Sequence, residues 1–440
     1  MESIALMSIQ TDYRPLFMSS PLLGPLITMF RNPAILSALS PSLAFGFATL
    51  IHHLTMYPPR LTPEQRQLRR LAQFAQSGGR GAPPPKSTDE NDEEARKQED
   101  AITDRCLVLV KEHKVMVSLV GVYRSQSRLA QGSLSTSLSS TLGSIACHLA
   151  QTESLRGLLV QQGLVGMLVR IAPSDRAAAQ ALARCGITLN PAIAFGEQHV
   201  TSVANSLWTL VVPPPVTGGL LESKNQQQPM HDSSLAHYES LLAITNLATL
   251  PTLGPHLGDW FIRLDRSDSL LADNLDIRRA AWELLCNMVW TSPDVLEKCV
   301  DNPRRLRLVL DMAVAHSHHD EEPAMRRAVL GVLAALTCCA PVVQYLAEHV
   351  SERSSEEGQK QEDVVAVTHL ERIMAVSKRE KDVEMMHRLS QMWVHVVEDE
   401  QVGRAWGRKM GLSKVLDGFV KQAKGHGGVV GLVGEAMKSL

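Results

Sequence analysis

Internal similarity is the feature that most constrains how this chain of 440 residues can fold. Residues 278–295 (RRAAWELLCNMVWTSPDV) resemble residues 326–343 (RRAVLGVLAALTCCAPVV), and the two copies carry equivalent prolines, Pro293 and Pro341. Related segments end at Pro251, Ser154 and Pro191. A unit that recurs at a fixed spacing is typical of repeat architectures, in which each unit packs on its neighbours.

The spacing of the copies identifies the type of repeat. Equivalent points are His148, Gly186, Asn246, Asn287, Ala335 and about Val394. The steps between them are 38, 60, 41, 48 and 59 residues, by subtraction of these numbers. The two long steps contain inserts at 213–234 (PPPVTGG, NQQQP) and 351–363, and without the inserts every step is roughly 38 to 48 residues, the period of armadillo and HEAT units.

Each unit has the pattern of a buried helix. Ala281, Leu285 and Val289 recur at intervals of four residues, and the proline that follows the segment cannot continue a helix. Aromatic residues are only 4% of the chain, so the core must consist of Leu, Val, Ala and Met, as in stacked helices. The sequence therefore predicts an all-α, armadillo/HEAT-like, right-handed superhelical solenoid. A second helix is expected over 155–171.

Composition divides the chain into segments. Residues 77–100 (SGGRGAPPPKSTDENDEEARKQED) are rich in Gly and Pro and then in charge, which predicts a disordered linker. We expect armadillo-like helices over 1–76 and a repeat solenoid over 101–440, with the inserts 213–234 and 351–363 as loops.

Charge and cysteine content exclude several classes of protein. The net charge of -2 gives no general attraction for nucleic acid or anionic membranes. The seven cysteines form no CxxC motif, which predicts free thiols in a reducing cytoplasm. The N-terminus lacks a basic region of the signal-peptide type. Residues 42–56 are apolar but shorter than the about 20 residues of a membrane span, so we expect a buried helix there.

No catalytic, cofactor or metal motif is evident in the sequence. There is no GxxxxGK[ST], HExxH or GxSxG. The segment HSHHD at 316–320 lacks a fourth zinc ligand and is expected to be a polar loop. The glycine-rich segment 425–434 does not follow a strand, which disfavours a dinucleotide site. We therefore expect neither catalysis nor a bound cofactor or metal.

Asn246 and Asn287 occupy the same place in consecutive repeats. A carboxamide both donates and accepts, so a ladder of Asn on a concave face can hold the backbone of an extended peptide. His53 and His148 are at similar points and extend the candidate ladder, whereas Ala335 interrupts it. The alternative is that each Asn satisfies carbonyl groups at its own helix end.

The pair Arg278 and Arg279 opens one repeat helix, and Arg326 and Arg327 open the next. Cations are disfavoured at a helix N-terminus, so these arginine pairs are a candidate binding site for an acidic partner protein. Acidic residues lie just before them, and local pairing is the favoured explanation; these residues are Asp273, Asp276, Glu321 and Glu322.

Two longer segments, 238–251 (YESLLAITNLATLP) and 277–300 (IRRAAWELLCNMVWTSPDVLEKCV), resemble the C-terminal domain of the UCS family of myosin-directed chaperones. Residues 45–75 are similar to an earlier stretch of that family, with His53 at its repeat turn. The resemblance implies a cytoplasmic chaperone or co-chaperone that binds the myosin motor domain through an armadillo groove. The candidate groove residues are Asn246, Asn287, Tyr238, Arg278, Arg279, His53 and His148.

The resemblance also allows a heat-shock chaperone as a second partner. Animal members dock it through a tetratricopeptide domain, whose 34-residue repeats do not occur in this sequence. The alternative function is an armadillo scaffold or transport adaptor that binds linear motifs without folding activity. Import adaptors pair their Asn ladder with a Trp ladder, whereas Trp208, Trp282 and Trp290 do not match between the copies.

Overall fold

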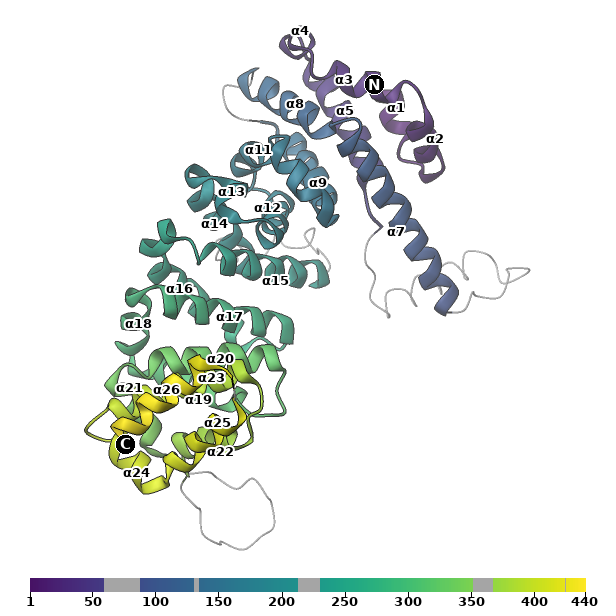
Figure 1. Ribbon diagram of the computed structural model, residues 1–440. Helices are drawn as coiled ribbons and strands as arrows, with labels where there is room; N and C mark the ends of the chain where they lie inside the picture. Colours follow the sequence, from purple (N-terminus) through teal and green to yellow (C-terminus); the bar gives the residue numbers. More distant parts are fainter. Residues whose placement is uncertain (59–87, 130–133, 213–229, 351–366, 424) are drawn as a thin grey trace, which may run out of the picture. The chain divides into compact units, whose positions relative to one another are not determined.

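The computed structural model describes residues 1–58, 88–129, 134–212, 230–350, 367–423 and 425–440 (Figure 1). Nearly all of these residues are helical. The two strands among them, β1 (His349–Val350) and β2 (Val367–Thr368), form a short antiparallel pair. The predicted all-α solenoid of armadillo type is confirmed.

The chain forms two compact units, residues 1–247 (unit 1) and 248–440 (unit 2). This division differs from the predicted domains. The N-terminal helices belong with residues 101–247 in one unit, and the predicted solenoid 101–440 is divided between the two.

Unit 1 is built around a row of long helices that follow the repeated segments. Its helices are α1 (Glu2–Met7), α2 (Arg14–Ser19), α3 (Leu23–Met29), α4 (Pro33–Ser37), α5 (Pro41–Thr55), α7 (Thr88–Lys111), α8 (Val115–Leu129), α9 (Thr136–Gln151), α10 (Arg156–Gln161), α11 (Leu164–Ile171), α12 (Arg176–Thr188), α13 (Pro191–Phe195), α14 (Glu197–Val211) and α15 (Met230–Leu247), with the 3-10 turns η1 (Thr11–Tyr13) and η2 (Glu153–Leu155). Helices α5, α9, α12 and α15 pack side by side in that order and form the long-helix row of unit 1.

Unit 2 has the same plan. Its elements are η4 (Pro251–His256), α16 (Leu257–Arg266), η5 (Ser269–Leu271), α17 (Leu275–Thr291), α18 (Pro293–Val300), α19 (Pro303–His316), α20 (Pro323–Leu336), α21 (Ala340–Ala347), β1, β2, α22 (His369–Arg379), α23 (Val383–Glu398), α24 (Gly403–Met410), α25 (Leu412–Gln422) and α26 (Gly427–Ser439). Its long-helix row is α17, α20, α23 and α26.

Local sequence explains where these helices begin and what they bury. Ala281, Leu285 and Val289 are all buried, which confirms the predicted stripe on α17. Asn274 accepts the backbone N–H groups of Asp276 and Ile277, so it caps the same helix. Proline occupies the first turns of α18 and α21, where its missing N–H would have no helical acceptor.

The predicted linker 77–100 is partly helical. Residues 88–100 form the beginning of α7, whereas 77–87 lie outside the described residues. The run of Asp and Glu followed by Ala, Arg and Lys explains the helix, because acidic residues favour an N-terminus and the later residues are good helix formers. Glu93 and Lys97 also form an ion pair at 2.7 Å across one turn.

The other two predicted inserts lie mainly outside the described residues. Residues 230–234 of the insert 213–234 begin α15, and the remainder of that insert lies outside the described residues, as does 351–363. The helix expected over 155–171 is divided into α10 and α11. Gly163 separates them with a φ of 92°, a left-handed conformation that glycine adopts without strain.

The apolar stretch 42–56 lies almost entirely in α5, where Phe47, Leu50 and Ile51 are fully buried. Among the described residues, no single helix has the length and apolar character needed to cross a membrane. By length and composition alone, the pair α20 and α21 passes this test together, but it is bent by 117°.

Candidate protein-binding surface

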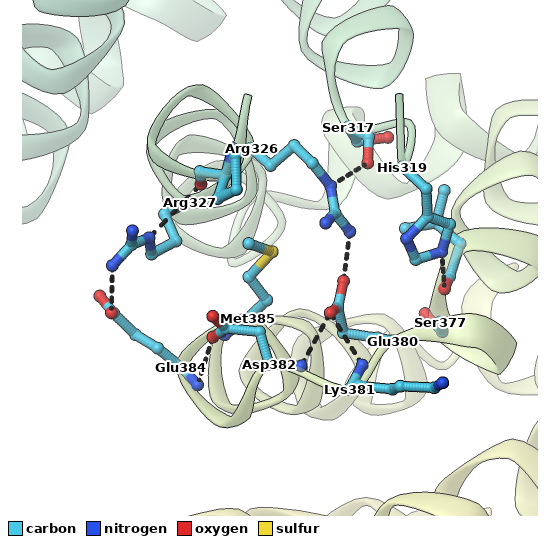
Figure 2. Close-up of polar contacts among 12 residues, drawn as sticks. Ser317, His319, Arg326, Arg327, Ser377, Glu380, Lys381, Asp382, Glu384 and Met385 are labelled. Carbon is cyan, nitrogen blue, oxygen red and sulfur yellow. Dashed lines mark hydrogen bonds and ion pairs between the residues drawn. The ribbon is translucent and has the colours of Figure 1, made fainter. Parts of the chain in front are cut away.

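Ion pairs join consecutive repeats in unit 2, and one of them is buried (Figure 2). Arg326 on α20 pairs with Glu380, which lies just before α23, and both residues are buried. The Nε of Arg326 also donates to the Ser317 carbonyl at 3.3 Å. The second carboxylate oxygen of Glu380 accepts the backbone N–H groups of Lys381 and Asp382, both at 2.9 Å.

The favoured local pairing of the arginines is therefore only partly correct. Arg279 does contact Asp276 at 3.5 Å, but its shorter contact, 2.8 Å, is with Glu322 at the start of the next repeat. Arg326 pairs with Glu380 and Arg327 with Glu384 (3.2 Å) on the following repeat, not with the preceding acids. These partners lie more than 40 residues away in sequence, which is why local spacing missed them.

Unit 1 contains a matching contact between its own repeats. Arg184 on α12 pairs with Glu239 on α15 at 3.0 Å. Arg184 Nη1 also donates to the Cys147 carbonyl on α9 at 2.8 Å, and Gln180 donates to Glu239 at 2.7 Å. One arginine thus connects three consecutive helices of the row.

Asn246 lies near the end of α15 and contacts the preceding repeat. Its amide nitrogen donates to the carbonyl groups of Gly186 and Ile187 on α12, at 3.0 and 3.1 Å. His395 makes the equivalent contact in unit 2, since its Nδ1 donates to the Ala334 carbonyl of α20 at 3.0 Å. The alternative prediction, that Asn246 satisfies carbonyl groups at its own helix end, differs from these contacts, because the acceptors belong to the end of the preceding long helix.

Asn287 lies on the incompletely buried side of α17. Arg279, Glu283, Asn287 and Trp290 follow one another at helical spacing and form one stripe, which we call the α17 stripe. Trp290 is 46% exposed, and its indole N–H donates to the Gly331 carbonyl on α20 at 3.0 Å. Asn287 belongs to unit 2 and Asn246 to unit 1, so the Asn ladder stays a prediction.

Gly331 allows the neighbours of α20 to approach it closely. A Cβ atom at this position would lie 2.5 Å from both Arg388 Nη1 and Cys286 Sγ. Arg388 on α23 donates to the Arg327 carbonyl and pairs with Glu384 at 2.9 Å. Side chains of α17 and α23 therefore cover this part of α20.

The other candidate residues lie in varied environments. His53 Nδ1 is 2.8 Å from the Ser8 hydroxyl, and the ring of His148 stacks on His52 with centroids 5.3 Å apart. Burial, with smaller contributions from His52 and Arg184, lowers the pKa of His148 to about 3. Tyr238 is half-buried on α15, and Arg278 donates to the Ala272 carbonyl at 3.4 Å.

The imidazole rings of the HSHHD segment contact different partners and do not converge on one point. His316 contacts Glu321 at 2.9 Å, and His319 contacts the Val376 carbonyl at 3.1 Å. Within the described ranges, no group of three or more potential metal-ligating side chains is present. All seven cysteines are free, and five of them are buried.

Sequence reasoning missed Trp290 and Arg388 as surface residues. The tryptophans of the chain do not align between the repeats, so the repeat pattern does not mark Trp290. Its spacing from Arg279, Glu283 and Asn287 places it on their side of α17, and this signal could have identified it.

Comparison with solved structures identifies the fold. UNC-45 from Drosophila melanogaster, at 20% identity and a TM-score of 0.67, matches 99% of this chain and 48% of its own length. She4p matches 99% of this chain and 53% of its own, at 15% identity and a TM-score of 0.68. The myosin chaperone UNC-45 from C. elegans, solved with a Hsp70 peptide, matches 100% of this chain and 41% of its own, at 18% identity and a TM-score of 0.62.

This chain has the fold of these solved structures. It spans about half the length of the chains that it matches. No family model matches the sequence. At identities of 15–20% the likeness establishes an armadillo-like helical solenoid, and the binding activity must be argued from the surface.

Proposed function

We propose that this protein is a cytoplasmic chaperone or co-chaperone that binds a myosin motor domain and assists its folding or assembly. The observation that carries the proposal is the structural likeness to UNC-45 and She4p over 99–100% of this chain. One of the similar structures is described as a chaperone with features critical for binding and folding muscle myosin. Two others are complexes with Hsp70 and Hsp90 peptides, so a heat-shock chaperone is the second partner proposed.

The α17 stripe is the client surface that the described residues support best. Trp and Arg are the residues that most often dominate the energy of protein interfaces, and the stripe contains one of each beside Asn287. Trp290 is held by its bond to the Gly331 carbonyl, so little side-chain freedom is left to lose when a client binds. Asn287 can donate to and accept from the backbone of an extended segment.

The remaining candidate residues are kept as proposed client contacts. Asn246 already donates to two carbonyl groups, and its proposed role therefore combines joining two repeats with contacting a client. Tyr238, Arg278, Arg279, His53 and His148 complete the proposed set.

Suppression of heat-induced aggregation of a purified myosin motor domain tests the proposal. The wild-type chain should protect the motor in a dose-dependent manner and bind it in a pull-down. The double variant Asn287→Ala/Trp290→Ala should bind at least about 30-fold more weakly, because loss of an interface hot spot costs about 2 kcal/mol or more. Circular dichroism would show that the variant remains helical.

Leu308→Ala is the matched control, because Leu308 is as exposed as Trp290 (46%) but lies on α19. It should protect like the wild type. Equal protection by the double variant would exclude the α17 stripe. A wild-type chain that binds the motor without protecting it would support a scaffold instead, and one that does neither would overturn the myosin proposal.

A further inference from the structure

A basic pocket lies in unit 2, apart from the α17 stripe. It has a volume of about 520 Å³ and is formed by the end of α22, the end of α24 and one side of α25. This volume is within the range of about 300–1,000 Å³ that is common for ligand pockets. Figure 1 shows these three helices near the C-terminal end of the described chain.

Four cationic side chains line the pocket and no carboxylate does. They are Lys378 of α22, Arg408 and Lys409 of α24, and Lys414 of α25. All four are exposed. Arg408 donates to the carbonyl of Leu440, whereas the three lysines make no ion pair within the described ranges. Four like charges around one concavity repel each other and attract an anionic ligand.

The pocket also has an apolar component. Met410, Val415 and Phe419 contribute to its lining, Met410 half-buried and the other two buried. A ligand that carries only charge would leave the exposed part of Met410 uncovered. A ligand with acidic groups on either side of an apolar side chain would match both parts of the lining.

We propose that this pocket binds an acidic peptide segment of a partner protein, with Lys378, Lys409 and Lys414 pairing with its carboxylates and an apolar residue of the peptide against the exposed part of Met410. This surface is separate from the proposed client surface and does not depend on the myosin proposal. It gives the protein a second binding site.

Nucleic acid fits the pocket less well. Single strands are held by bases stacked on aromatic rings, and the one aromatic residue of the lining, Phe419, is 2% exposed. The chain as a whole has a net charge of -2, so it lacks the general attraction for phosphates that nucleic-acid-binding domains show.

Fluorescence polarisation with the full chain tests this inference. The probe is a fluorescein-labelled peptide, Glu-Glu-Leu-Asp-Glu-Glu, and its neutral counterpart is Gln-Gln-Leu-Asn-Gln-Gln. The acidic peptide should bind at 50 mM salt at least 10-fold more tightly than the neutral one. Its affinity should fall as salt is raised, because the Debye length shortens to about 10 Å at 0.1 M.

The variant Lys409→Glu/Lys414→Glu should weaken binding of the acidic peptide at least 10-fold. Its matched control is Lys381→Glu/Lys421→Glu, which makes the same change in net charge at two exposed lysines outside the pocket and should change binding less than 3-fold. Equal losses in the two variants would overturn the proposal, as would absence of binding by the wild type at 1 mM. Tighter binding of labelled oligo(dT), lost in the pocket variant, would overturn it in favour of nucleic acid.

Discussion

Arg326 and Glu380 form an ion pair whose side chains are only 7% and 3% exposed, although 54 residues of sequence separate them. Removing two charges from water is costly, and such a pair persists only when further hydrogen bonds satisfy both groups. Here Ser317 supplies a carbonyl to the guanidinium, and two backbone N–H groups reach the carboxylate. The pair joins two repeats inside the core of unit 2.

The first prediction concerns this pair. Arg326→Met should lower the free energy of unfolding by about 3–5 kcal/mol, because it leaves a buried carboxylate without its cation. Urea unfolding followed by circular dichroism would measure the loss. Adding Glu380→Gln should recover part of it, since the uncharged carboxamide oxygen can still accept the N–H groups of Lys381 and Asp382.

The neighbouring pair is the control. Arg327 and Glu384 are 3.2 Å apart but 40% and 52% exposed, and exposed pairs contribute about 0–1 kcal/mol. Arg327→Met should therefore change stability little. A loss as large as that of Arg326→Met would show that burial does not distinguish the two pairs.

The second prediction concerns Asn246. Asn246→Ala removes the donor for two carbonyl groups at the end of α12 and should cost about 1–3 kcal/mol. Asn246→Asp should cost more, because a carboxylate cannot donate and would face the two carbonyl oxygens. Thermal melting of the two variants gives the order, and an Asp variant as stable as the wild type would contradict the observed contact.

The third prediction concerns Gly331. Gly331→Ala introduces a Cβ into the space between Cys286 and Arg388, and overpacking of this kind costs about 1–3 kcal/mol. Cys286→Ala removes one of the two atoms with which the new Cβ would clash. The double variant Cys286→Ala/Gly331→Ala should therefore recover part of the stability that Gly331→Ala loses. Additive losses in a double-mutant cycle would argue against the close packing around Gly331.

The fourth prediction concerns pH. The pKa of His148 is about 3 in the folded chain, because burial disfavours the cation, and about 6.5 in the unfolded chain. Below pH 6.5 the unfolded state therefore binds more protons than the folded state. The contribution of His148 to the free energy of unfolding is fully present above pH 6.5 and is lost as pH falls towards 3. Between pH 7 and pH 5 the loss is about 2 kcal/mol.

His148→Leu provides the test of this assignment. The Nδ1 atom of His148 is buried without a hydrogen-bond partner within the described ranges. Replacing the ring by an apolar side chain therefore breaks no hydrogen bond of that atom. The variant should lose less stability than the wild type between pH 7 and pH 5 in urea unfolding. An identical pH dependence would show that other groups cause the acid sensitivity.

The fold could be predicted because its signals are local. The stripe through Leu285 and the prolines at 293 and 341 define helices from sequence alone, and α17, α18 and α21 follow them. The dominance of charge in residues 88–100 predicts a linker, although many of the same residues are good helix formers and begin α7.

The contacts of the candidate surface are not local, and sequence could not supply them. Asn246 and Gly186 are aligned in the repeats, but alignment does not reveal that one side chain reaches the other's carbonyl group. Arg326 was expected to pair with acids a few residues away, whereas the helix packing brings Glu380 to it. The spacing of Trp290 places it on the side of Asn287, but its 46% exposure depends on how α17 packs on α20.

The Arg326–Glu380 contact determines where the chain can be shortened. A recombinant fragment that stopped after α21 would retain Arg326 but lack both Glu380 and α23, and would expose to water the side of α20 that α23 covers. A fragment of unit 1 that ended before α15 would separate Arg184 from Glu239 in the same way. Single repeats of this protein are therefore poor building blocks for transplantation, because each one carries half of an electrostatic contact that only its neighbour completes.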